Sequence, residues 1–150
     1  DKARLALANG YAHCIDRRSE DIAARVRQIT GGAGVPVVYD SVGKDPFDAS
    51  LNSLAPRGYF VSFGTTTGAP PPIVAATLQK MGSLYVTRPT LVTYTANTEE
   101  LRASAAAVFE LVGKGVLKVS INQRYPMGDI ARAHADLESG RTTGSTIIIP

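Results

Sequence analysis

Three short segments place small, hydroxylated and basic residues directly after apolar runs, and these residues are the ones best suited to bind a ligand. The segments are Asp40-Ser41-Val42-Gly43, Phe63-Gly64-Thr65-Thr66 and Val86-Thr87-Arg88-Pro89. A guanidinium such as that of Arg88 can clamp a phosphate or a carboxylate, and a turn of small residues lets the backbone approach a nucleotide. Each segment also has a purely structural interpretation, because helix caps, polar loops and solvated strand ends use the same residue types.

Side chains for nucleophilic, acid–base or metal chemistry are few. His13 and His134 have no neighbouring Asp-Ser or Cys arrangement, so we interpret both as packing or surface residues. Cys14 lies among apolar residues and is predicted to be a buried, inert thiol. The sequence lacks the Gly-x-Gly-x-x-Gly, Walker and Gly-x-Ser-x-Gly motifs, and two histidines with one cysteine cannot form the usual four-ligand zinc site.

The composition is that of a globular chain, with one domain as the default. Of 150 residues, 44% are hydrophobic and 19% charged, and 16 basic against 13 acidic residues leave a thinly spread net charge of +3, which argues against nucleic-acid binding. No apolar stretch approaches about 18 residues and no signal sequence is recognisable, so we expect a soluble, cytoplasmic protein without a membrane span. Because the chain opens at Asp1 in a helical pattern without an initiator Met, we interpret it as part of a longer protein.

Apolar periodicity predicts helices that alternate with strands. Helices are expected over residues 2–8, 20–29, 47–54, 73–81, 99–113 and 127–137, with Ser19 and Thr98 as N-caps. Strands are expected over residues 11–15, 35–40, 59–64, 83–87, 116–119 and 146–149, with a turn at 56–58. The run over 35–40 is apolar without alternation, which indicates a strand covered on both faces. The pattern predicts an α/β fold with a mostly parallel sheet and right-handed crossovers.

Ligands of such sheets bind outside the carboxyl ends of the strands. The three polar segments follow the strands expected over 35–40, 59–64 and 83–87, so they would gather along one edge, which we take as the candidate binding site. The glycine-rich run over 31–34 follows a helix and precedes a strand, the reverse of the phosphate-binding order. We therefore interpret it as a helix stop and a turn.

With these elements in place, the sequence resembles the cofactor-binding part of NADPH:quinone oxidoreductases, in the zeta-crystallin-like branch of the medium-chain dehydrogenase/reductase superfamily. The stretches that carry the resemblance are Ile29-Thr30-Gly31-Gly32, residues 37–43, Val61-Ser62-Phe63-Gly64, residues 82–89, Ala133-His134 and Leu137-Glu138-Ser139. The resemblance implies a Rossmann-like, mostly parallel sheet with helices on both faces, truncated at its N-terminus before the glycine fingerprint. It also implies a partial NADPH-binding domain over 1–125, and a helix and strand over 126–150 that return toward a GroES-like catalytic domain.

The resemblance also assigns cofactor contacts. At the adenosine end, Lys2 matches a lysine that contacts the 2′-phosphate, Arg17 stands where relatives often carry a tyrosine, and Ser41 lines the adenosine side. Arg141 corresponds approximately to an arginine near the C-terminus, since Gly140 falls at the nearer alignment position. The segment Phe63-Gly64-Thr65-Thr66 matches a loop that passes the nicotinamide ribose, and Val86-Thr87-Arg88 a segment beside the nicotinamide.

The function implied by the resemblance is the NADPH-dependent reduction of quinones or related activated carbonyls, without zinc and without a catalytic side chain. It also implies a homodimer through the edge strand Ser83–Thr87, and an unpaired strand as apolar as Leu84-Tyr85-Val86 would itself be an aggregation hazard. Alternatives remain open: an enoyl-thioester or alkenal reductase of the same superfamily, a non-catalytic nucleotide- or RNA-binding module suggested by a pI of about 9.2, or a structural dimerisation unit. We expect the isolated 150 residues to be inactive.

Overall fold

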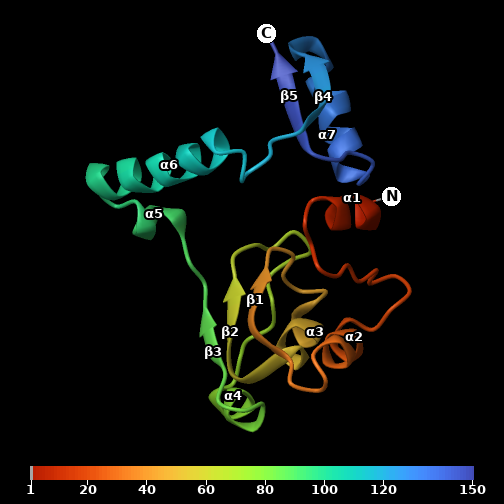
Figure 1. Cartoon of the computed structure of the whole chain (residues 1–150), viewed down its shortest axis with the longest axis vertical. Helices are drawn as coiled ribbons and strands as arrows, with labels where there is room; N and C mark the ends of the chain where they lie inside the picture. Colours follow the sequence, from red (N-terminus) through yellow and green to blue (C-terminus); the bar gives the residue numbers. More distant parts are fainter. Residues whose placement is uncertain (1) are drawn as a thin grey trace. The chain divides into compact units, whose positions relative to one another are not determined.

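Helices and strands alternate along the chain in the computed structural model, which describes residues 2–150 (Figure 1). Asp1, where the first expected domain begins, lies outside these residues. The elements are α1 (Lys2–Ala8), α2 (Ile22–Ile29), β1 (Val35–Asp40), α3 (Phe47–Asn52), β2 (Leu54–Ser62), α4 (Ala75–Lys80), β3 (Tyr85–Thr87), α5 (Leu91–Tyr94), α6 (Thr98–Gly113), β4 (Ile121–Pro126), the 3-10 helix η1 (Met127–Asp129), α7 (Ile130–Glu138) and β5 (Ser145–Ile149). They form two compact units, one over 3–94 and one that comprises Lys2 and 95–150.

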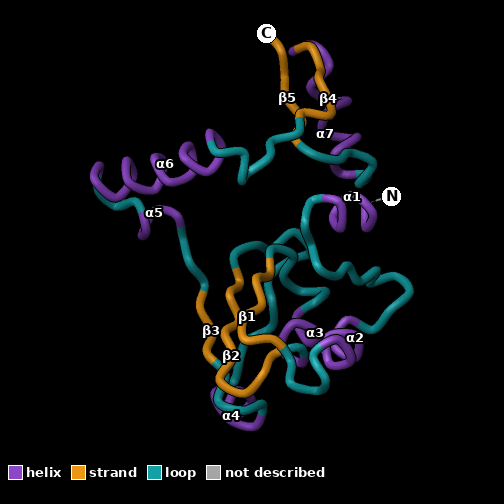
Figure 2. Tube along the Cα trace, in the orientation of Figure 1, coloured by secondary structure: helices purple, strands orange, loops and turns teal. Residues whose placement is uncertain are grey.

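The first unit is built on a parallel sheet in the order β1-β2-β3 (Figure 2). Helix α3 packs against β1 and β2, and the core between them consists of Phe47, Leu51, Leu54, Phe60 and Leu84. The Phe47 and Phe60 rings meet edge to face with their centroids 5.8 Å apart, an arrangement that aromatic quadrupoles favour. The predicted α/β fold with parallel strands is therefore confirmed.

The opposite face of this sheet carries tyrosines. Tyr59 and Tyr85 are register partners on β2 and β3, and their rings stack with centroids 4.7 Å apart. Tyr39 of β1 lies on the same face, because it is two residues from Val37, the register partner of Tyr59, and it is 73% exposed. Because side chains alternate along a strand, the residues of the core and these tyrosines lie on different faces of the sheet.

Polar side chains cap the starts of α2 and α6, and both caps differ from the prediction. The N-cap of α2 is Asp21, whose carboxylate accepts a hydrogen bond from the Ala24 amide at 2.7 Å, whereas Ser19 donates to the backbone of Asp16. The N-cap of α6 is Asn97, not Thr98. An acceptor must reach the amide of N2 or N3, and the sequence places several candidate acceptors within two residues of each start.

Two predicted strands are absent from the described chain. Neither residues 11–15 nor 116–119 form a strand, and Cys14, predicted to be buried, is exposed. Two elements were missed, α5 and β4, and β2 runs through the turn predicted at 56–58, with Arg57 at a φ of 62°. A short apolar run becomes a strand only where a neighbour exchanges backbone hydrogen bonds with it, and sequence periodicity does not contain that information.

The second unit pairs β4 and β5 in parallel, with α7 packed on β4. Helix α7 begins after η1, and both it and β5 lie close to their predicted positions. Ala133 of α7 is buried. Within residues 2–150, none of the helices combines the length and the hydropathy needed to span a bilayer.

Candidate functional site

The carboxyl ends of β1, β2 and β3 lie at one edge of the first unit's sheet. Their parallel register sets Asp40 beside Ser62, and Val61 beside Thr87. The segments that follow these strands therefore begin at the same edge, where α/β sheets bind ligands. The three polar segments singled out in the sequence are brought together as expected.

The first two of these segments form an interlocked pair of loops, residues 41–46 and 63–68, which we call the loop platform. The Thr67 amide donates to the Val42 carbonyl at 2.9 Å, and the Lys44 amide donates to the Gly68 carbonyl at 3.0 Å. Side chains add to these bonds, since the Thr66 hydroxyl donates to the Ser41 carbonyl at 3.1 Å. The two loops are thus held to each other by backbone bonds and by the hydroxyls of Thr66 and Thr67. The side chains of Ser41, Phe63 and Thr65 remain exposed on the surface for a ligand.

Two glycines permit this close approach. A Cβ atom at Gly64 would lie 2.1 Å from the Ser41 carbonyl oxygen, and one at Gly43 would lie 2.4 Å from the Gly68 carbonyl oxygen. Gly43 also has a φ of +96°, in the region that favours glycine. Sequence reasoning could identify a glycine turn at each place, but not that each glycine faces the other loop.

The platform offers hydrogen-bonding groups to a ligand. Ser41, Thr65 and Thr66 are exposed, as is Phe63 with 52% of its surface. Within the described chain, no acceptor is bonded to the backbone amide of Gly64, Thr65 or Thr66. Hydroxyls and amides of this kind can hold ribose or phosphate oxygens, and the neighbouring aromatic ring can cover an apolar face.

The third segment continues the site along the sheet edge. Val86 and Thr87 form the end of β3, Arg88 follows directly, and all three are exposed. Arg88 is the cation that this segment adds to the edge. In the part of the chain that the structure describes, no three His, Cys, Asp or Glu side chains lie close enough together to ligate a metal ion.

The remaining predicted cofactor residues take no part in the hydrogen bonds of the loop platform. Arg17 is exposed in the segment between α1 and α2. Lys2 clusters with the second unit, where its ammonium donates to the Gly140 carbonyl at 2.5 Å. Arg141 is also in this unit and donates to Asp136 at 2.6 Å and to the Ser139 hydroxyl at 2.9 Å. Lys2 therefore reaches the turn that carries Arg141.

Asp136 connects Arg141 to β4. Tyr125 donates its hydroxyl proton to Asp136 at 2.8 Å, and this bond, with the nearby Arg141, holds the pKa of the Asp136 carboxyl below its usual value. The same hydrogen bond raises the pKa of the Tyr125 phenol. Arg132 lies 6.0 Å from the Tyr125 ring centroid and completes the cluster. Sequence reasoning singled out Arg141 but missed its carboxylate partner, because the two are five positions apart, across a helix end and a turn.

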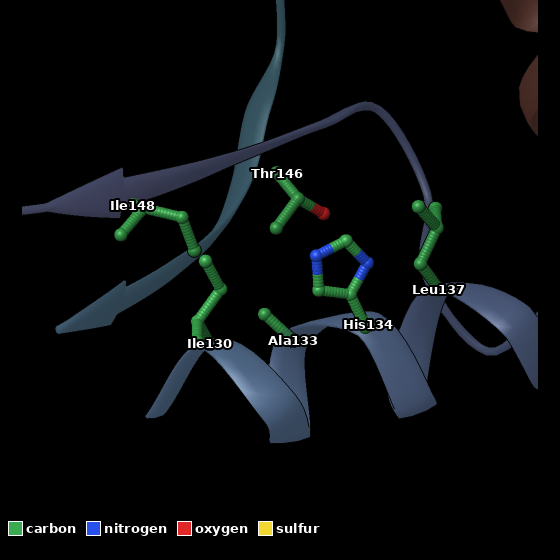
Figure 3. Close-up of a pocket in the computed structure, with 6 residues that line it drawn as sticks. All are labelled: Ile130, Ala133, His134, Leu137, Thr146 and Ile148. Atoms are coloured by element: carbon green, nitrogen blue, oxygen red, sulfur yellow. The ribbon is translucent and has the colours of Figure 1, made fainter. Parts of the chain in front are cut away.

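A cavity of about 170 Å³ in the second unit was also not predicted. Its lining is mostly apolar and consists of Ile130, Ala133, His134, Leu137, Thr146 and Ile148. Figure 3 shows the imidazole of His134 turned from α7 toward Thr146 of β5. The helical spacing of the four α7 residues was the available signal. His134 is exposed, and a packing or surface role was predicted for it.

Comparison with known proteins identifies the family of the chain and its relatives. The sequence model of the family described as "Zinc-binding dehydrogenase" matches residues 9–148. The chain belongs to the zinc-binding dehydrogenase family. A quinone oxidoreductase of Pseudomonas aeruginosa is 47% identical over the whole chain, which covers 46% of that protein. A 2-haloacrylate reductase of a Burkholderia species is 40% identical over the whole chain, which covers 45% of it.

The fold of this zinc-binding dehydrogenase chain is also shared with solved structures. The crystal structure of Escherichia coli quinone oxidoreductase complexed with NADPH matches 99% of the chain with a TM-score of 0.93 and 46% identity, and the chain covers 46% of it. The chain thus spans about half the length of the curated relatives it matches. These findings confirm the family resemblance and the Rossmann-like α/β fold expected from the sequence.

Proposed function

We propose that this chain is the cofactor-binding part of an NADPH-dependent, zinc-independent reductase of quinones or related activated carbonyls. The observation that carries the proposal is the loop platform at the carboxyl edge of a parallel sheet, in a chain with the fold of a quinone oxidoreductase solved with NADPH. The donor set of that edge, hydroxyls and amides with Arg88 beside them, fits the ribose and phosphate oxygens of a dinucleotide.

In the proposed complex, each segment at the edge of the sheet contacts a different part of NADPH. Ser41 lines the adenosine side, residues 63–66 pass the nicotinamide ribose, and residues 86–88 lie beside the nicotinamide ring. Lys2 and Arg17 are the proposed residues at the 2′-phosphate, and Arg141 is a further proposed cofactor contact. Bound NADPH supplies the reducing equivalents, and the chain's residues bind and orient it, so no side chain of the chain is assigned a catalytic role.

The proposed whole protein is a cytoplasmic homodimer that joins at β3 and acts on a quinone. Support for the dimer is the position of β3 at the sheet's edge, with Tyr85 and Val86 exposed there. Within the chain, residues 1–125 form the proposed nucleotide-binding part, and residues 126–150 form a helix and a strand that return toward the catalytic domain. Tyr85→Asp, which places a charge on this edge, should convert the dimer to a monomer in light scattering. An unchanged mass would contradict the proposed interface.

A second candidate function is the reduction of an activated alkene. It is favoured by the 40% identity to a 2-haloacrylate reductase, which covers the whole chain. Oxidation of NADPH by the whole protein, followed by absorbance with a quinone, a 2-haloacrylate and an enoyl thioester in turn, separates the two functions. Greater kcat/KM for either alkene than for the quinone would replace the first proposal by the second.

Binding measurements test the part of the proposal that both functions share. We expect the whole protein to bind NADPH more tightly than NADH in calorimetry, and the isolated 150 residues to show no turnover. Binding of single-stranded RNA with a steep salt dependence, together with no binding of NADPH, would instead indicate a nucleic-acid-binding module.

A further inference from the structure

A buried carboxylate lies beneath the loop platform. Asp40, the last residue of β1, is only 4% exposed. One of its oxygens, Oδ1, accepts hydrogen bonds from the amides of Val42 at 2.8 Å and Gly43 at 2.9 Å. The other, Oδ2, accepts one from the Ser50 hydroxyl of α3 at 2.8 Å, and Ser50 is itself 8% exposed.

Burial makes these three hydrogen bonds necessary. A carboxylate removed from water loses its hydration, and only nearby donors compensate for that loss. An aspartate at an exposed turn could form the same two bonds to Val42 and Gly43 without help from α3. The additional bond from Ser50 therefore links the helix to the loop through the Asp40 carboxylate.

The link extends across the platform. The segment that Asp40 holds, residues 41–43, supplies the carbonyls that accept bonds from Thr66 and Thr67 of the other loop. The backbone carbonyl of Asp40 also accepts a bond from the Phe63 amide at 2.9 Å. A shift of the Asp40 carboxylate would thus move both loops, although neither Asp40 nor Ser50 reaches the exposed surface of the platform.

We propose that Asp40 and Ser50 form a positioning pair that fixes the loop platform in its binding geometry before the cofactor arrives. This inference rests on the proposed function, because it assumes that the platform binds NADPH. Neither side chain touches the cofactor in this proposal. Their effect is to remove the conformational freedom that the loops would otherwise lose on binding, which improves affinity without a new contact.

A matched pair of substitutions in the whole protein tests the proposal. Ser50→Ala removes the hydroxyl that bonds Asp40. Ser53→Ala removes the hydroxyl of another buried serine, at the end of α3, which donates to the Ala49 carbonyl at 2.7 Å. Ser50→Ala should raise the Kd for NADPH about fivefold, the order expected from one hydrogen bond to a charged group that is partly coupled to binding. Ser53→Ala should leave the Kd within about twofold at a similar loss of stability.

A second pair of variants separates hydrogen bonding from charge. Asp40→Asn keeps an oxygen that can accept from Val42 and Gly43, and its amide can donate to the Ser50 oxygen, so it should retain most of the affinity. Asp40→Ala loses all three bonds and should raise the Kd more than tenfold, as several coupled bonds are lost together. Rescue by asparagine is the result that a general loss of stability would not produce.

Hydrogen exchange supplies a readout that does not require the cofactor. Without NADPH, the amides of Val42, Gly43 and Thr67 should exchange faster in Ser50→Ala than in Ser53→Ala. Equal exchange and equal Kd values in these two variants would overturn the positioning role while leaving NADPH binding in place. A wild-type whole protein that fails to bind NADPH would overturn the proposed function, and this inference with it.

Discussion

Replacing Gly64 by alanine tests whether the loop platform depends on backbone-to-backbone contact. The new Cβ would lie 2.1 Å from the Ser41 carbonyl oxygen, 2.6 Å from its carbonyl carbon and 2.8 Å from its Cα. All three are backbone atoms, so no side-chain rotation relieves the overlap. The φ of Gly64 is outside the left-handed region, and the substitution therefore acts through this contact and not through backbone strain.

The loss of stability can be worked out from the separation of the two loops that the new Cβ requires. Separation of the loops costs about 1–3 kcal/mol in overpacking, and the loss of the Thr66–Ser41 bond adds roughly 1 kcal/mol. A total of about 3 kcal/mol lowers the Tm by roughly 6–12 °C in a chain of this size. The same separation should weaken NADPH binding by about tenfold or more, since the platform's hydroxyls and amides would no longer converge.

The assays are thermal unfolding and calorimetric titration of NADPH, with Gly113→Ala as the control. Gly113 ends α6 and has no positive φ, and a Cβ atom added there would meet no neighbouring atom within 4 Å. Alanine at this position should therefore stabilise the helix by up to about 1 kcal/mol. If Gly64→Ala unfolds at the wild-type temperature and binds NADPH with wild-type affinity, the two loops do not depend on each other as described.

Three further substitutions have expected outcomes. Ser62→Ala should be neutral or stabilise the protein by up to about 1 kcal/mol in urea unfolding, because the Ser62 hydroxyl is buried and, among the described residues, has no hydrogen-bond partner; a loss above that amount would indicate a missed partner. Lys2→Ala in the whole protein should reduce the preference for NADPH over NADH by roughly 1–3 kcal/mol in paired titrations, the value of a charge-assisted phosphate contact; an unchanged ratio would reject its assignment. Asp136→Asn should lower stability at neutral pH, and its difference from wild type should shrink as the pH falls below the ordinary Asp value of 3.8. The sign follows because a carboxyl whose pKa is lower in the folded protein stabilises the fold above the pKa of the unfolded state. That contribution to stability is lost as the carboxyl is protonated. The pKa of Tyr125 is raised, so the Tyr125 phenol has the opposite pH dependence: its contribution to stability is lost as the pH rises beyond 10.0.

Strong local patterns explain which elements were predictable. The β1 bounds follow from a compact β-branched run between turn residues, and α6 from a long apolar periodicity with acidic residues at its start. Strand β4 has no such signal, since Asn122, Gln123 and Arg124 interrupt it, and it becomes a strand by pairing with β5. Residues 11–15 show the reverse, an apolar run without a partner strand in the described chain.

The candidate site was predictable in its location and not in its construction. Strand ends with Ser41, Thr66 and Arg88 indicated the edge, because parallel strands bring their carboxyl ends together. The support beneath that edge was hidden, because Asp40 and Ser50 are ten residues apart in separate elements and only the fold places them in contact. Contacts that depend on tertiary packing have no periodic trace in a sequence.

The stacked rings of Tyr59 and Tyr85 give the protein a built-in optical probe. The sequence contains no tryptophan, so tyrosine accounts for its near-ultraviolet emission, and nothing stronger masks it. Both rings are about half exposed, and a surface that closes over that face of the sheet would change their polarity and their quenching. The sequence contains six tyrosines, so the difference in emission between the wild type and a Tyr59→Phe, Tyr85→Phe variant isolates the signal of this pair and can follow what docks there.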